Sequence, residues 1–503
     1  MHQGVLIHLF GMAAALFMAA TPVMAAEAPA KDTVVIDLSG ETSNCDPHLQ
    51  WSVNSYAVYR NIFDNMLTRD QEGKVIPHIA VSWKQLADNK IEFKLRTDVK
   101  FHDGTPLTPE DVVYTIKRIT SKELASPQRS QFEAVIAAEA TAPDTVVFTT
   151  KAPYPALFSQ LTKLSIVPKA YVEKVGSETF NLKPIGSGPY KFVSWDRGVS
   201  IKLERNDAYW GQKGFFPKAE FRFVPDAGTR VADLRTGKAD LTVDMNSDLI
   251  ASIKNDKVCE PRITLSERVA FVRTNNGHSP TDNRLIRFAM AYGIDKQGLI
   301  DGLNDGRDRL THTLVVPEMA GYKPVQGLQY DPEKAKKLVA EAGAVAKEKM
   351  VFVTAPAFDQ RVVQALQQMM NDLGMNVVID MKDQTSFLKA MQQGELSTRP
   401  HLSLGTWSGG ALDADAIAYP LLNSTSAWSQ TRDPELDKVL EAARSCLDPE
   451  KRADLYAQAS KIAIDNAYIL PLFQMCALYA ANKHLVWKPS IDENIFLNRM
   501  SWK

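Results

Sequence analysis

The sequence predicts an α/β protein of several domains, and two observations lead to this fold class. Residues 350–354 have a strand pattern, residues 361–373 a helical pattern and residues 376–381 a second strand pattern. Strand, helix and strand in this order predict a βαβ unit, and therefore some parallel sheet. The chain has 503 residues, which at roughly 150 residues per domain indicates two to four domains.

The composition is that of an ordinary globular protein. Hydrophobic residues make up 45% and charged residues 23%, which argues against disorder, a collagen-like chain or a coiled-coil rod. Lys and Arg number 58 against 59 Asp and Glu, a net charge of −1. The net charge therefore gives no indication that the protein binds nucleic acid or an anionic membrane surface.

The first half of the chain is rich in strand patterns. Alternating or β-branched runs predict strands at 32–38, 91–95, 144–149, 201–203 and 221–224. Apolar residues at helical spacing predict a helix over 52–67. A second helix is expected after Thr108, because Thr suits the N-cap, Pro109 suits the first helical position, and Glu110 and Asp111 are acids in the first turn.

From about residue 280 helical patterns dominate. Besides the βαβ unit, amphipathic spacing and capping residues predict helices over 284–303, 331–342, 434–443 and 448–466. Gly186, Gly188 and Pro189 predict a tight turn at which two backbones approach closely.

Residues 1–25 predict a secretory signal peptide. An uncharged apolar stretch runs from Leu9 to Ala20, and small residues at the exit place cleavage after Ala25. Later segments fall short of the roughly 18 continuous apolar residues of a membrane span. We therefore expect an exported, periplasmic protein without a membrane span in the mature chain.

Export permits disulfides, and the chain has four cysteines. Cys446 and Cys476 are near enough in sequence to pair, with Cys45 and Cys259 remaining. The sequence alone allows three pairings, or none.

Motifs for catalysis and for metal binding are missing. The chain has neither HExxH nor CxxC, and it has no phosphate-binding GxxxxGK[ST] loop. Gly186-Ser187-Gly188 lacks the spacing of a nucleophile elbow. The sequence thus gives no argument for an enzyme, a metal site or a cofactor.

Several blocks of the sequence resemble the family-5 extracellular solute-binding proteins, the receptors of ABC importers for dipeptides, oligopeptides, nickel and related solutes. The blocks are KPIGSGPYKFVSWDRGVSIKLERNDAYW at 183–210, FKLR at 93–96 with KFHDGTPLT at 100–108, PTDNRLIRFAMAYGID at 280–295 and YDPEKA at 330–335. They extend, in order, through nearly the whole mature chain.

The resemblance implies a type II periplasmic binding protein, a two-lobed clamshell with an extra inserted subdomain. Lobe I is expected to comprise 32–72, 184–279 and 486–503, the inserted subdomain 73–183, and lobe II 280–485. A solute would bind between the lobes and select the closed form. The expected partners of this monomer are a small-molecule solute and an inner-membrane ABC permease.

The resemblance also places ligand residues in three segments that line the cleft. They are His48, Trp51, Tyr56, Arg273, Asn275, Trp407, Ser408, Asp413 and Asp415. Trp407 is the foremost candidate, since an aromatic ring at a strand end offers a flat platform with an N–H donor. Its alternative role is core packing.

Position 410 departs from the peptide-binding relatives. These carry an Asp about three residues after the equivalent of Trp407, where it pairs with the α-ammonium of the peptide. Here the position is Gly410. A plain peptide is therefore in doubt, unless Asp413 replaces the missing carboxylate through a loop shift.

Arg273 lies in an apolar strand pattern, so its charge needs a partner if it is buried. One alternative is an acid within the protein, and the other is a carboxylate or phosphate of the ligand. On a strand, Phe271, Arg273 and Asn275 share one face.

Four functions remain open. The first is a non-catalytic receptor for a small polar solute of a carboxylated, opine-like or glycosidic kind. The second is a dipeptide or oligopeptide receptor with a displaced ammonium anchor. The third is an exported hydrolase with Asp413 or Asp415 and a histidine as acid and base, and the fourth is a holdase for unfolded chains.

Overall fold

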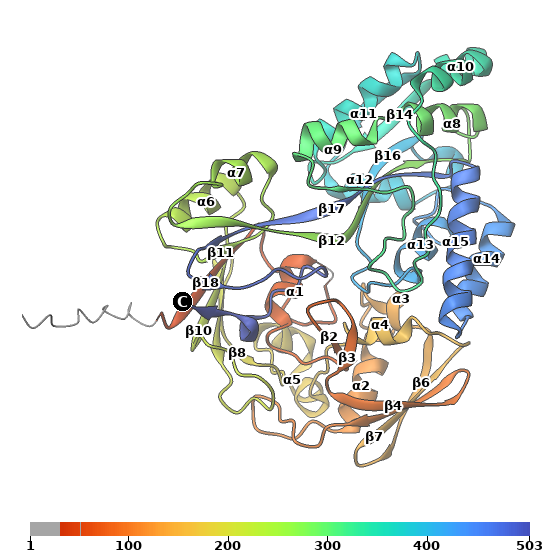
Figure 1. Cartoon of the computed structure of the whole chain (residues 1–503). Helices are drawn as coiled ribbons and strands as arrows, with labels where there is room; N and C mark the ends of the chain where they lie inside the picture. The colour runs from red at the N-terminus through yellow and green to blue at the C-terminus, as the bar shows by residue number, and fades with distance from the viewer. Residues whose placement is uncertain (1–30, 51) are drawn as a thin grey trace, which may run out of the picture.

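The computed structural model describes residues 31–50 and 52–503. The predicted signal peptide, residues 1–25, lies outside the described residues, as does Trp51. Figure 1 shows the described chain as two bodies, one with helices α8 to α15 and one with the N-terminal elements.

A large mixed sheet runs through both bodies. Its strands, in spatial order, are β15 (Asn376–Met381), β14 (Lys349–Thr354), β16 (Leu402–Trp407), β12 (Cys259–Thr274), β17 (Ile469–Asn482), β11 (Leu241–Thr242), β1 (Thr33–Leu38), β10 (Lys218–Phe223), β9 (Ser200–Arg205) and β8 (Tyr190–Asp196), with β13 (Arg309–Leu310) paired to β17. The predicted mixture of helices and strands with some parallel pairing is confirmed.

Two long antiparallel strands, β12 and β17, join the bodies (Figure 1). The first part of β12, residues 259–265, pairs only with β17, whereas residues 269–273 pair with both β17 and β16. The register shifts between Leu265 and Val269. A β-bulge of this kind bends a strand, and here it lies between the two lobes.

The first lobe is built on β1 and β8 to β11. Its further elements are α1 (Val53–Tyr59), β2 (Leu67–Arg69), β3 (Val75–Pro77), α5 (Lys169–Leu182), α6 (Ala227–Arg235), α7 (Ser247–Ser252), β18 (Leu485–Val486), the 3-10 helix Leu497–Arg499 and β19 (Ser501–Trp502). A core of buried side chains, among them Val34, Ile36 and Phe221, joins the sheet to α1 and α5.

Helix α1 is shorter than the predicted helix over 52–67. The carbonyls of Asn61 and Ile62 accept hydrogen bonds from the backbone N–H groups of Tyr190 and Gly188 instead of continuing a helix. The predicted close approach at the glycine turn is confirmed, because a Cβ at Gly186 would lie 2.1 Å from the carbonyl oxygen of Ile62.

A smaller antiparallel sheet with its own core lies in sequence between β3 and α5 of the first lobe. Its strands are, in order, β4 (Ala80–Ala87), β5 (Lys90–Leu95), β7 (Thr145–Thr150) and β6 (Val135–Ala142), and its helices are α2 (Pro109–Thr120), α3 (Arg129–Phe132) and α4 (Leu157–Leu161). The predicted start of α2 is confirmed: the Thr108 N–H donates to Asp111 at 2.9 Å, and Pro109 is the first helical residue.

The second lobe packs helices on both faces of β14, β15 and β16. They are α8 (Arg284–Gly293), α9 (Lys296–Asn304), α10 (Pro332–Ala342), α11 (Gln360–Asp372), α12 (Gln384–Gln392), α13 (Asp415–Leu422), α14 (Pro434–Ser445) and α15 (Pro449–Asp465), with the 3-10 helices Gly343–Lys347 and Leu396–Thr398. The parallel pairing of β14 with β15 across α11 is the predicted βαβ unit.

The predicted helix over 284–303 is two helices. Helix α8 ends at Gly293, and Asp295 caps α9 by accepting a hydrogen bond from the Gly298 N–H at 2.8 Å. An Asp inside a helical pattern thus acts as a new N-cap. The residue bounds of the lobes and of the inserted subdomain stay a prediction.

The cysteines form no disulfide among the described residues: Cys45, Cys259, Cys446 and Cys476 are all free. Of the sequence alternatives, the one without pairing applies to this structure.

Candidate functional site

Residues 408–415, here called the contact loop, connect β16 to α13 and touch both lobes. Glu267, in the bulge of β12, accepts hydrogen bonds from the Ser408 hydroxyl at 2.7 Å and from the Leu412 N–H at 2.8 Å. Glu267 is 1% exposed. A buried carboxylate at the hinge therefore holds the contact loop of the second lobe.

Side chains from the N-terminal body hold the same loop. Arg69 donates to the carbonyl of Ala411, and Lys163 donates to the carbonyl of Gly409. The Tyr154 hydroxyl donates to the Asp415 carboxylate at 3.1 Å. These contacts bridge the two bodies, so the structure has the lobes in a closed arrangement.

Gly410 is fitted tightly against Lys163. Its φ is +59°, in the left-handed region, and a Cβ there would lie 2.3 Å from Lys163 Nζ. The same Cβ would lie 3.6 Å from Glu267 Oε1. The left-handed backbone conformation favours glycine, and an added Cβ would require the ammonium of Lys163, which occupies the space beside residue 410, to move.

Burial sets the electrostatics around Lys163. Burial lowers the pKa of Lys163 to about 8, while the charge of Glu267 acts in the opposite direction. The ring of Tyr56, a half-buried side chain, lies 6.0 Å from Lys163 Nζ. Burial also raises the pKa of the Tyr56 hydroxyl. The site thus places charged groups next to aromatic surface.

The two acids of the contact loop are buried and have partners within the protein. Arg452 donates to both oxygens of Asp413, at 2.6 and 3.0 Å. Asp415 accepts from Tyr154 and, at 3.3 Å, from Tyr456, and Arg444 lies 3.6 Å away. Burial raises the pKa of Asp415.

His48 and Asn275 also have partners within the protein. Nε2 of His48 lies 3.0 Å from the carbonyl oxygen of Ser165, and its Nδ1 lies 2.9 Å from Arg118. Burial and the nearby Arg118 lower the pKa of His48 to about 4. The amide of Asn275 donates to the carbonyls of Leu396 and Arg399.

Trp407 and Arg273 both lie beside the Trp428 ring in the second lobe. Trp407 Nε1 donates to the carbonyl of Ala416 at 3.0 Å, and its ring meets that of Trp428 edge to face at 5.3 Å. The guanidinium of Arg273 lies 5.2 Å from the Trp428 ring and 5.1 Å from the Phe271 ring. Both predicted residues therefore contact the same tryptophan.

The structure thus gathers Trp407, Ser408, Asp413 and Asp415 at the contact loop and gives His48 and Asn275 other neighbours. Sequence reasoning missed Glu267, Lys163, Arg69 and Tyr154, which hold this loop. The polar triplet Ser266-Glu267-Arg268 between two apolar runs is a pattern that could have indicated the bulge. Lys163 and Arg69 give no such pattern.

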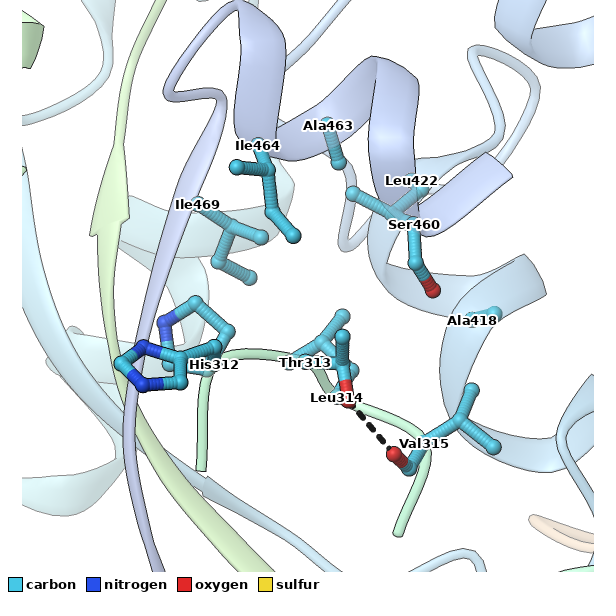
Figure 2. Close-up of a pocket in the computed structure, with 11 residues that line it drawn as sticks. His312, Thr313, Leu314, Val315, Ala418, Leu422, Ser460, Ala463, Ile464 and Ile469 are labelled. Atoms are coloured by element: carbon cyan, nitrogen blue, oxygen red, sulfur yellow. Dashed lines mark hydrogen bonds between the residues drawn. The ribbon is translucent and has the colours of Figure 1, made fainter. Parts of the chain in front are cut away.

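A small cavity lies elsewhere in the second lobe (Figure 2). It is lined mainly by aliphatic side chains of α13, α15 and β17, among them Ala418, Ile464 and Ile469, with His312 at one side. The Thr313 hydroxyl bonds the carbonyl of Val315 at 2.7 Å. It includes none of the predicted ligand residues, so it does not mark the candidate site.

In residues 31–50 and 52–503 no group of three or more His, Cys, Asp or Glu side chains is arranged to hold a metal ion. Across that same part of the chain, no helix has the length and apolar character needed to cross a bilayer.

A family model described as bacterial extracellular solute-binding proteins, family 5 Middle, matches residues 74–429. The periplasmic oligopeptide-binding protein OppA of Salmonella typhimurium is 26% identical over 508 residues, which cover 93% of this chain and 92% of the relative.

Solved structures share the fold. The substrate-binding protein CtaP of Listeria monocytogenes superposes with a TM-score of 0.85 at 22% identity, covering 94% of this chain and 99% of that chain. AgaA of A. tumefaciens R10, solved with agropinic acid, superposes with a TM-score of 0.80 at 22% identity, with coverage of 94% and 99%. These neighbours confirm the two-lobed binding-protein fold.

Proposed function

The chain belongs to the bacterial extracellular solute-binding proteins of family 5, and from this premise we propose that it is a periplasmic receptor for an ABC importer. A small polar solute binds between the two lobes, and the permease receives it from the closed form. Trp407, Ser408 and Tyr56 are the side chains that we assign to the solute.

The observation that carries this proposal is the contact loop. Its residues bond Glu267 at the hinge and Lys163, Arg69 and Tyr154 from the opposite body. Opening the lobes breaks the bonds from Lys163, Arg69 and Tyr154, so a solute that contacts both sides shifts the equilibrium toward closure. Closure by differential binding is the property a transport receptor needs.

The surroundings of Gly410 favour a solute without a free ammonium group. Lys163 brings an ammonium to within 2.3 Å of where a Cβ of residue 410 would lie, and the carboxylate of Glu267 is near it. An α-ammonium of a peptide would meet the like charge of Lys163, which costs free energy in a buried site. We therefore favour carboxylated, opine-like or glycosidic solutes.

A peptide receptor is the second candidate, and one observation favours it. Glu267 Oε1 would lie 3.6 Å from a Cβ at position 410, so it offers a carboxylate near the missing anchor. Asp413 is less suited to that role because Arg452 holds both of its oxygens. OppA, a relative of this chain, is an oligopeptide-binding protein.

Binding without catalysis accords with the chemistry of the contact loop. The family consists of substrate-binding proteins. Asp413 and Asp415 are bonded to arginine and tyrosine side chains, and among the described residues neither is bonded to a histidine. The acid and base pair that a hydrolase requires is therefore not assembled there.

Native mass spectrometry of the purified protein, followed by thermal-shift titration of the solute it carries, tests the proposal. A ligand that binds only the folded protein stabilises it by RT ln(1 + [L]/Kd), so we expect a melting temperature that rises with concentration and a solute that leaves unchanged. Turnover of the solute, or a melting temperature that no solute of these classes moves, would contradict the proposal.

A further inference from the structure

Arg273 differs from the other buried arginines of the described chain. The others each donate at least one hydrogen bond to a backbone carbonyl or a carboxylate; they are Arg60, Arg69, Arg118, Arg230, Arg287, Arg399 and Arg452. Arg273 is 5% exposed, and among the described residues it has neither a hydrogen bond nor an ion pair.

No acid of the described residues balances the charge of Arg273. Burial alone lowers the pKa of Arg273 to about 10, with no acidic side chain acting against it. A buried cation without a partner is costly, and proteins rarely keep one unless something else supplies the counter-charge. Of the two sequence alternatives, the internal acid is therefore not realised among the described residues.

The neighbours of Arg273 are aromatic rings, so the N–H donors of its guanidinium remain available to a ligand. The guanidinium carbon lies over the Phe271 and Trp428 rings, 5.1 and 5.2 Å from their centres, in cation–π contact with both. The N–H donors of a guanidinium lie in its plane, where they match a carboxylate. The Phe271 and Trp428 rings offer these donors no oxygen acceptor.

A second unpaired donor lies beside it. Ser403 is directly opposite Arg273 in the β12–β16 pairing, so both side chains are on the same face of the sheet. The Ser403 hydroxyl is fully buried and makes no hydrogen bond with the described residues. Two buried donors without acceptors on one face indicate an acceptor that is bound rather than built in.

We propose that Arg273 and Ser403 form a subsite for a carboxylate of the solute, which makes the transported solute an organic acid. The solute then lies beside Trp407 and Trp428, whose rings are 5.3 Å apart, with its acidic end at the guanidinium of Arg273. One arginine supplies a single positive charge, which suits a monoanionic carboxylate better than a dianionic phosphate. This inference rests on the proposed receptor function.

Paired solutes test the subsite. The wild-type protein is titrated by thermal shift with small organic acids, the primary amides of the same acids, phosphate monoesters of similar size, and neutral glycosides. We expect carboxylates alone to stabilise it, and their apparent affinity to fall about 30-fold or more in Arg273→Met. Arg273→Lys keeps the charge but loses the fork, so an intermediate loss is expected, and Ser403→Ala should weaken binding by a smaller factor.

The stability of the variants separates a ligand role from a structural one. Because Arg273 has neither a hydrogen bond nor an ion pair with the described residues, Arg273→Met should melt no lower than the wild type without solute, and Arg273→Lys provides a second folded variant. Arg230→Met is the matched control: it loses three bonds to carbonyls of the first lobe, so it should melt lower and keep the preference for acids over amides.

Each outcome has a distinct meaning. An acid and its amide that bind equally, binding that survives Arg273→Met, or stabilisation by phosphate esters or neutral glycosides alone overturns the carboxylate subsite and leaves the receptor function standing. Stabilisation by no member of any class contradicts the receptor function, and the subsite with it.

Discussion

The ammonium of Lys163 lies directly against Gly410 of the other lobe, in the position that a larger side chain at residue 410 would need. A Cβ on residue 410 would lie 2.3 Å from Lys163 Nζ, and the same ammonium donates to the carbonyl of Gly409. A glycine in one lobe thus makes room for a lysine of the other. Where peptide-binding relatives are expected to present a carboxylate to a ligand's ammonium, this chain presents a glycine to its own lysine.

Gly410→Ala tests this relationship. The left-handed φ of +59° strains any other residue by roughly 1 kcal/mol or more, and the added methyl group displaces Lys163. We expect a lower melting temperature and a solute affinity at least about tenfold weaker, measured by calorimetric titration. Gly302→Ala is the control, because nothing lies within 4 Å of its added Cβ and its φ is not left-handed. Equal effects of the two substitutions would show that the fit at Gly410 is unimportant.

Trp407→Ala should weaken solute binding by about 1–3 kcal/mol, since it removes an aromatic platform beside the contact loop. The half-buried ring also meets Trp428, so some loss of stability accompanies it. Trp407→Phe helps to separate the two effects: it keeps a smaller aromatic ring at the position and loses the hydrogen bond to the Ala416 carbonyl. Unchanged affinity in Trp407→Ala, measured by fluorescence or calorimetric titration, would show that Trp407 serves only the core.

Arg452→Met should destabilise the fold by about 3–5 kcal/mol in urea unfolding, because it leaves the buried Asp413 carboxylate without its bidentate partner. The double variant Arg452→Met, Asp413→Asn removes the unpaired charge and should recover part of this loss. If the double variant is destabilised by the full sum of the single effects, the pair does not act as a unit.

Asp37 should make the free energy of unfolding depend on pH in the range below neutrality. It lies on β1 with no exposed surface, and burial raises its pKa from 3.8 to about 7, although Arg222 acts in the opposite direction. Between these values the folded protein holds a proton that the unfolded chain has lost, so the free energy of unfolding falls as the pH rises from about 4 to 7.

Asp37→Asn should flatten this fall, with a gain at pH 7 on the order of a few kcal/mol over the gain at pH 4. Urea unfolding at a series of pH values measures it. An Asp37→Asn profile parallel to the wild type would show that this carboxyl does not titrate in that interval.

The local patterns of the sequence predicted much of the fold. The βαβ unit around α11, the Pro109 start of α2 and the glycine turn at Gly186 depend on neighbouring residues or on one glycine, which a sequence shows directly. The break between α8 and α9 was missed, because Asp295 at a helical position also suits an N-cap and only tertiary packing decides between the two roles.

The site was less predictable because it depends on contacts between distant segments. Lys163 and Arg69 meet the contact loop only across the two bodies, and Glu267 meets it through the pairing of β12 with β16. The neighbours of Lys163 and Arg69 in sequence do not indicate these contacts. Arg273 was found because a charge in an apolar strand is anomalous by itself. The absence of an acid beside it could be seen only in the structure.

Small-angle X-ray scattering of the protein with and without its solute tests the central claim most directly, since two lobes that close over a ligand change the dimensions of the whole molecule. We expect the radius of gyration to fall on addition of a solute that raises the melting temperature, and the fall to be lost in Gly410→Ala at the same solute concentration. A scattering curve that is identical in the two states, under conditions where binding is saturated, would contradict closure of the lobes over the solute.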